Sequence, residues 1–86
     1  MPEIFRLFGF VFFFYSREHE PIHIHVEGNG GRARFVFDDN DGAFSLSEST
    51  GIKSGDLKKI TRVIEDNTDI LVKTWNKYFK MDDENS

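Results

Sequence analysis

The chain has no cysteine, and this absence already excludes several classes of site. Without cysteine there can be no disulfide framework, no thiolate nucleophile, no iron–sulfur cluster and no cysteine-ligated zinc site. Long apolar runs are also missing, because the longest spans only residues 8–15 and is too short for a membrane span or a signal sequence. We therefore expect a cytoplasmic protein that does not enter the membrane.

The chain also lacks a large excess of charge of either sign, since the net charge of its 86 residues is only −4. Residues 38–86 carry this whole excess, with seven basic residues against eleven acidic ones. This balance disfavours broad affinity for nucleic acid and leaves room for a small local basic patch that contacts RNA. The size and the hydrophobic content of 38% indicate a single folded domain over residues 1–80, followed by an acidic disordered tail over residues 81–86.

Aromatic and β-branched residues dominate the first half of the chain and predict β-strands. Gly9 separates the first two apolar runs, and a polar turn precedes a short fifth strand. The expected strands are residues 4–8, 10–16, 22–27, 32–38 and 43–46. From the expected N-cap Ser54 to about Phe79, apolar residues recur at steps of three and four, which predicts one long amphipathic helix.

These patterns predict an α+β fold in which a four- or five-stranded, mainly antiparallel sheet packs on one long C-terminal amphipathic helix. Asn29-Gly30 sets the register of the central hairpin, because both loop residues of a type I′ turn need positive φ. Counting outward pairs Ile24 with Phe35 on the apolar face and His25 with Arg34 on the polar face. The expected core comprises Phe10, Phe12, Ile22, Ile24, Val26, Phe35, Phe37, Leu57, Ile60, Ile64 and Leu71.

All three histidines fall between residues 19 and 25, and His23 and His25 lie two apart on a strand, so they share a face. Three interpretations stay open. Beside Arg34, the two imidazoles could act as general acid and base on an RNA phosphodiester, with the guanidinium stabilising the charged intermediate. They could instead be half-buried structural side chains, or ligate a metal with His19 or Glu27 as the third ligand.

Arg32 and Arg34 are candidates for binding an anion, since a guanidinium suits both phosphate and a partner's carboxylate. Arg32 is expected opposite Glu27, whose charge it offsets, whereas Arg34 faces His25 rather than an acid. Because Arg32 would compete with a cation for the Glu27 carboxylate, we expect no bound metal and no cofactor.

The second expected strand is apolar on both faces, with Val11, Phe13 and Tyr15 on the face away from the helix. One helix covers only one face of a sheet, so these side chains predict docking of a protein partner or of a second copy. In the alternative interpretation, this is the central strand and the chain's own loops close the far face. Together with His19 and Arg32, these three are the candidate binding residues.

Several short motifs resemble one known family. These motifs are Ile4-Phe5-Arg6, Phe12-Phe13-Phe14-Tyr15-Ser16, His19-x-Pro21-x-His23-x-His25-Val26, Gly31-Arg32-Ala33-Arg34-Phe35 and Leu57-Lys58-Lys59-Ile60. With them the chain resembles the small bacterial family called domain of unknown function 4160. The likeness covers nearly the whole chain. Ile22 departs from it, because the family usually has a second proline at that position.

The resemblance implies a component of a two-protein operon in the manner of type II toxin–antitoxin modules, and hence a protein partner. The histidine-bearing strand, the hairpin and the helix start also resemble HicA-type ribonuclease toxins, which implies a catalytic role for His23 or His25. The leading interpretation is a protein-binding module of a toxin–antitoxin-like pair. The alternatives are a metal-independent ribonuclease or RNA-binding toxin that uses His23, His25 and Arg34, and a histidine-ligated metal site.

Overall fold

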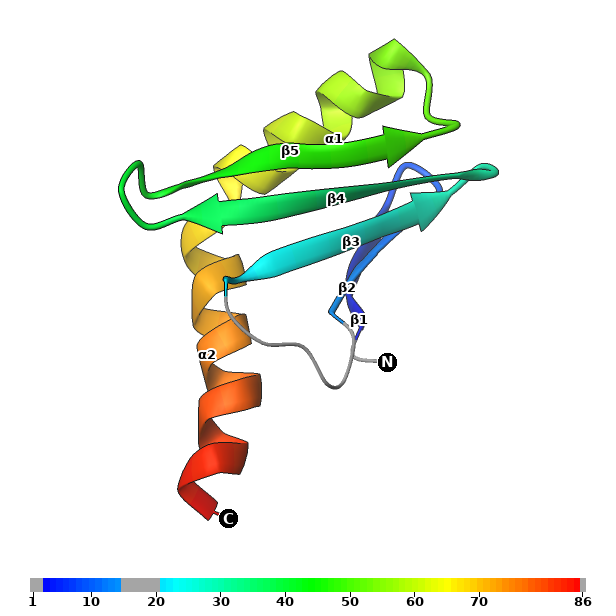
Figure 1. Cartoon of the computed structure of the whole chain (residues 1–86). Helices are drawn as coiled ribbons and strands as arrows, with labels where there is room; N and C mark the ends of the chain where they lie inside the picture. The colour runs from blue at the N-terminus through cyan, green and yellow to red at the C-terminus, as the bar shows by residue number, and fades with distance from the viewer. Residues whose placement is uncertain (1–2, 15–20, 86) are drawn as a thin grey trace.

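In the described part of the chain, five strands in chain order form one antiparallel sheet, and two helices follow them (Figure 1). The computed structural model describes residues 3–14 and 21–85, with side chains up to Phe79. The elements are β1 (Glu3–Leu7), β2 (Phe10–Phe13), β3 (His23–Gly28), β4 (Gly31–Asp38), β5 (Ala43–Thr50), α1 (Ser54–Asp66) and α2 (Thr68–Asn85). The α+β class and the antiparallel sheet are confirmed.

The central hairpin has the register that Asn29-Gly30 predicts. Both loop residues have positive φ, 50° for Asn29 and 81° for Gly30, as a type I′ turn requires. Gly28 pairs with Gly31, and the register then runs outward through the predicted pairs to His23 and Val36. Since side chains alternate between the two faces of a strand, this register puts the histidines on one face and the branched aliphatic residues on the other.

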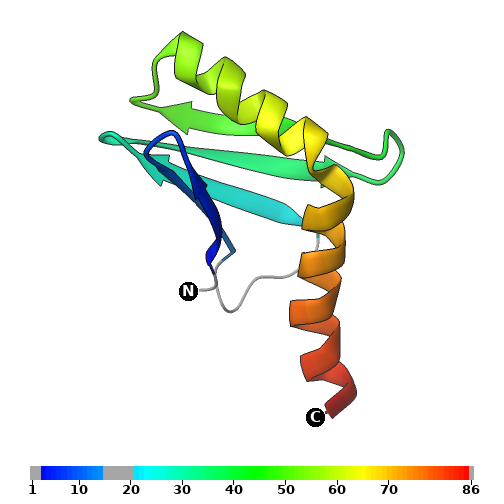
Figure 2. The ribbon, with the colours of Figure 1, turned by 180° about the vertical axis from the view of Figure 1, so that it is seen from behind.

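The core lies between the sheet and the helices. Figure 2 shows α1 in front of the sheet when the molecule is seen from behind, and α2 running down past the start of β3. The buried core cluster comprises Phe10, Phe12, Phe14, Ile22, Ile24, Val26, Ala33, Phe35, Phe44, Ile60, Ile64, Leu71 and Trp75. Phe37 and Leu57, which the sequence predicts in the core, are partly buried and pack against it.

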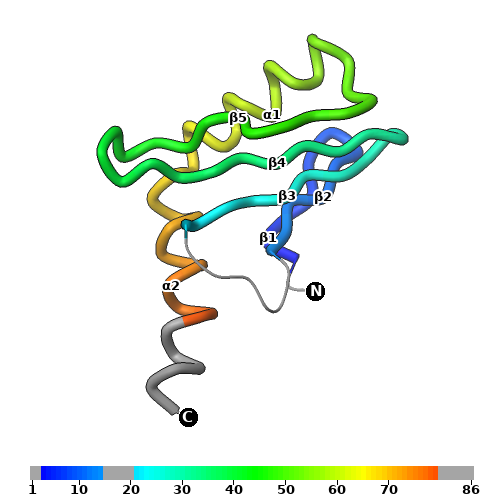
Figure 3. The backbone as a smooth tube through the Cα atoms, viewed as in Figure 1, coloured from blue at the N-terminus to red at the C-terminus, as the bar shows by residue number. Residues whose placement is uncertain are grey.

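The prediction of one long helix is wrong, because the helical path breaks at Asn67. This residue leaves the helical region, with φ −118° and ψ 18°, and its side-chain Nδ2 donates to the Val63 carbonyl at 2.7 Å. Asparagine competes in this way with the backbone pattern of a helix. The break turns the chain (Figure 3), so that α1 follows β5 while α2 brings Leu71 and Trp75 into the core.

The expected N-cap is also displaced by one residue. Lys53 is the N-cap of α1, and no side chain caps the helix at this end. Ser54 is instead the first helical residue. Of the helices in the part of the chain that the structure describes, neither is long and apolar enough to cross a lipid bilayer.

At the other edge of the sheet, β1 carries the ion pair between Glu3 and Arg6. The Arg6 guanidinium lies 2.9 Å from the Glu3 carboxylate, and this hydrogen bond lowers the pKa of Glu3 below its ordinary value. A lowered folded-state pKa stabilises the fold above the unfolded pKa of the carboxyl, and this contribution is lost as the pH falls. Both side chains are exposed, so solvent screens the pair.

Candidate functional site

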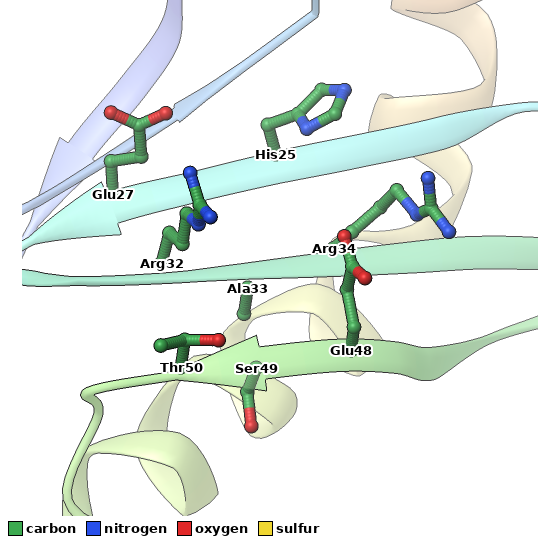
Figure 4. A pocket seen from close by; sticks show the side chains of 8 residues that line it. All are labelled: His25, Glu27, Arg32, Ala33, Arg34, Glu48, Ser49 and Thr50. Carbon is green, nitrogen blue, oxygen red and sulfur yellow. The ribbon is translucent and has the colours of Figure 1, made fainter.

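The face of the sheet away from the helices is polar, and its charged side chains come from β3, β4 and β5. The strand pairing sets His25 opposite Arg34 and Glu27 opposite Arg32. On the other side of β4, Arg34 lies opposite Glu48 and Arg32 lies opposite Thr50. Figure 4 shows these side chains on one side of the strands, around a cavity of about 330 Å³.

Arg34 is the most constrained cation in this cavity. Its side chain is half-buried, and Nη2 donates to the Ser47 hydroxyl at 3.1 Å. The Nε atom is buried and has no hydrogen-bond partner among the described residues. A buried polar atom without a partner costs about 1–3 kcal/mol, and more when the group is charged. An acceptor for this Nε would therefore stabilise the site, and a bound molecule can supply one once the Arg34 side chain turns toward solvent.

The charged side chains around Arg34 are also unneutralised within the described parts of the chain. Glu27 faces Arg32 and Glu48 faces Arg34, yet neither pair forms an ion pair. Three of these residues are exposed, so the face presents alternating positive and negative groups to solvent. The expected offset of Glu27 by Arg32 is present as a register pair and absent as a salt bridge.

His23 and His25 lie on the predicted shared face, and their rings are 5.4 Å apart. His23 Nδ1 lies 2.7 Å from the Pro21 carbonyl oxygen, and because a carbonyl only accepts, Nδ1 carries the proton. In the neutral ring Nε2 is then an acceptor. The His23 ring also lies 5.6 Å from the ring of Trp75, so it packs at the end of the sheet where α2 passes.

The predicted docking residues of β2 are not brought together as one exposed surface. Phe13 is only 1% exposed, and its ring stacks on His25 at 5.5 Å. Val11 is half-buried opposite Glu27. Tyr15 and His19 lie outside the described residues. The polar face accordingly offers the charged groups of β3, β4 and β5 rather than the aromatic rings of β2.

The sequence interpretation missed the contribution of β5 to this face. The sequence predicts a short fifth strand that ends at Leu46. β5 instead continues to Thr50 through a bulge near Arg34 and brings Glu48 to the cavity. The sequence signal for this end is Gly51, whose φ of 73° suits glycine and closes the strand.

Among the described side chains, those of residues 3–14 and 21–79, no group of three from histidine, aspartate and glutamate gathers closely enough to hold a metal ion. His25 is the histidine that lines the described cavity, and it is accompanied by Arg32 and Arg34, which are not metal ligands. The chemistry of this face is therefore that of guanidinium, imidazole and carboxylate groups.

Comparisons with known proteins place the chain in a family, and they assign no reaction or ligand to this face. No curated protein and no solved structure matches it. The model of the family described as Domain of unknown function (DUF4160) matches residues 9–76. The match runs from the β1–β2 turn to α2 and includes β3, β4 and β5 with every described residue of the polar cavity. The chain therefore belongs to the family of proteins that carry this domain of unknown function, DUF4160.

Proposed function

We propose that this chain is a small cytoplasmic protein-binding module, one member of a toxin–antitoxin-like pair, that contacts its partner through the polar face of the sheet. The observation that carries the proposal is the buried Nε of Arg34, which has no partner among the described residues. A carboxylate of a partner protein can satisfy this group when the Arg34 side chain turns toward it, because a guanidinium binds a carboxylate through two parallel hydrogen bonds.

The charges around Arg34 favour a protein over a nucleic acid. Glu27 and Glu48 line the same cavity as the two arginines, so a phosphate backbone laid across it would meet two carboxylates. A protein surface can present both signs of charge in matching positions, which raises specificity and association rate. The net charge of −4 also disfavours nucleic acid as the partner, because like charges repel.

Arg34→Lys tests the proposal most directly, because it keeps the positive charge and removes Nε. A charge-assisted hydrogen bond contributes about 1.5–3 kcal/mol, so we expect the Kd for the protein encoded beside this chain to rise about 10–100-fold. Isothermal titration calorimetry with the co-expressed neighbour measures the change. Lys77→Ala, an exposed charge on α2, is the control and should leave the Kd unchanged.

Unchanged affinity in both Arg34→Lys and Arg34→Ala would contradict docking through this cavity. Circular dichroism of the variants separates a loss of contact from a loss of fold. If the neighbouring protein binds and only residues outside the cavity affect its affinity, the interface lies elsewhere and the proposed use of the polar face is wrong.

A ribonuclease is the second candidate, and one contact favours it. The Pro21 carbonyl accepts a hydrogen bond from His23 Nδ1, so Nε2 is the nitrogen of the neutral ring that has the basic lone pair. His23 would act as the base and take the proton of an RNA 2′-hydroxyl as that oxygen attacks the adjacent phosphorus. His25 would protonate the leaving 5′-oxygen, and Arg34 would stabilise the charged phosphorane, giving a 2′,3′-cyclic phosphate.

This second candidate predicts cleavage of single-stranded RNA in the presence of a chelator. His25→Ala should reduce the rate by about 10²–10⁴-fold while the protein stays folded, since proton transfer by a positioned side chain contributes this much. Gel analysis of a labelled oligonucleotide checks the rate. Equal cleavage by wild type and by His25→Ala would show that the activity belongs to a contaminant, and it would leave the binding proposal intact.

A further inference from the structure

The outer edge of β5 is a second surface that the polar face does not include. β5 is the last strand of the sheet, and among the described residues it pairs only with β4. Seven of its eight residues are exposed, and it contains neither proline nor lysine. Such an edge presents unpaired N–H and C=O groups that can accept another strand. By contrast, β1 at the opposite edge has only five residues, of which Glu3 and Arg6 are charged, whereas β5 has the single charged residue Glu48 in eight.

A groove of about 630 Å³ runs between this edge and α1. Leu46 from β5 and Leu57 from α1 supply its apolar part, and Leu46 is 42% exposed. The chain turns back after β5, so α1 runs beside the strand in the opposite direction (Figure 1). A strand added to β5 would therefore lie against an apolar strip that this helix already provides.

The charges along the groove are arranged in two blocks. Lys58 and Arg62 come first along α1, and Glu65 and Asp66 follow them at its end. All four side chains are exposed, and none forms an ion pair within the described chain. Two such helices placed side by side in opposite directions would bring the basic block of each beside the acidic block of the other. The groove is therefore complementary to itself.

From this complementarity we infer that the occupant of the β5 edge is a second copy of this chain, docked about a two-fold axis. The two β5 strands would pair antiparallel and join two five-stranded sheets into one of ten strands. A register centred on Ser45 sets Leu46 opposite Phe44 of the second copy, on the helix side of the sheet. The polar face of each copy stays open, so the dimer is independent of the proposed partner contact.

Sedimentation velocity over a concentration series from low to high micromolar tests this dimer in the whole chain. Wild type should shift from monomer to dimer as concentration rises. Leu46→Lys introduces a charge into the groove and should raise the dimer Kd by at least about tenfold. Ile70→Lys, which places the same charge at a 56% exposed position on α2, is the matched control and should dimerise as wild type does.

A charge exchange along α1 identifies the orientation of the two copies. Lys58→Glu with Arg62→Glu should weaken the dimer by at least about tenfold, because like charges then face each other across the axis. Adding Glu65→Lys and Asp66→Lys reverses both blocks and should restore dimerisation. Lys73→Glu with Lys77→Glu on α2 changes the net charge equally and should have little effect.

Three outcomes would overturn the inference. The first is a wild-type chain that stays monomeric throughout the series. The second is a dimer whose Kd responds to none of the α1 or Leu46 substitutions. The third is hydrogen exchange in which the amides of residues 43–47 become protected only when the neighbouring protein is added, which would assign the edge to that protein instead.

Discussion

Replacing Trp75 by alanine is expected to lower the free energy of unfolding by about 3–5 kcal/mol, the range for truncating a fully buried large aromatic residue. Trp75 is 2% exposed and belongs to the core cluster. Its ring contacts Phe14 edge-on at 5.1 Å, Phe79 at 4.2 Å and His23 at 5.6 Å. The substitution thus removes contacts of α2 with β3 and with the residue that follows β2. This loss is large for a small domain, whose total stability is about 5–15 kcal/mol.

Urea denaturation followed by circular dichroism measures this loss. Ile70→Ala on the same helix is the matched control, because Ile70 is 56% exposed and its truncation should change stability by no more than about 0.5 kcal/mol. Equal losses in the two variants would mean that α2 does not pack on the sheet through Trp75. A Trp75→Phe variant should recover part of the stability, since it retains an aromatic ring in the same space.

Gly28→Ala is expected to destabilise the protein by about 3 kcal/mol, at the upper end for overpacking, through a clash with the backbone. Gly28 pairs with Phe10 on β2 and with Gly31 on β4, so backbone lies on both sides of it. A Cβ atom at this position would meet the Gly9 carbonyl oxygen and approach the Phe10 Cα to 2.9 Å. Backbone cannot swing aside as the end of a flexible side chain can, so β2 and β3 would have to separate.

Gly55→Ala is the control for that substitution. Nothing lies within 4 Å of a Cβ built at Gly55, which is in the first turn of α1. Alanine there should raise stability by up to about 1 kcal/mol, because it restricts the unfolded chain and favours the helix. Thermal melts of both variants give the comparison. Stability changes of the same sign and size would contradict the close approach of β2 and β3.

The hairpin of β3 and β4 was predictable because one local signal determines it. Asn29-Gly30 favours a type I′ turn, and a two-residue turn leaves a single register in which the apolar residues share a face. The structure has this register, and His25 therefore faces Arg34 as expected. The neighbours of the candidate site across these two strands follow from the turn alone.

The break between α1 and α2 was not predictable from apolar periodicity. Asn67 fits the step of the apolar stripe, so the pattern continues through it without interruption. The interruption depends on tertiary structure, because α1 must follow β5 while Leu71 and Trp75 must reach the core. A straight helix of this length would carry its second half past the sheet.

Whether the charged side chains at the candidate site form ion pairs was also not predictable from the sequence. Facing positions predict attraction between Glu27 and Arg32, but whether exposed side chains meet depends on rotamers that solvent and entropy decide. The burial of Phe13 was equally unpredictable, because its exposure of 1% depends on tertiary contacts, of which the stacking on His25 is one. Alternation assigns Phe13 to the polar face and does not reveal how deeply it lies there.

The chain order of the sheet bears on how this protein is made. Each strand after β1 pairs with the one synthesised just before it, so most sheet contacts are local and the meander can form early and quickly. The apolar face with Phe12, Ile24 and Phe35 stays uncovered until Trp75 can pack on it, and Trp75 leaves the ribosome only after all five strands. During that interval the nascent chain is a sheet with an uncovered apolar side and a free edge. We expect it to depend on a chaperone during translation more than a helical protein of equal length does.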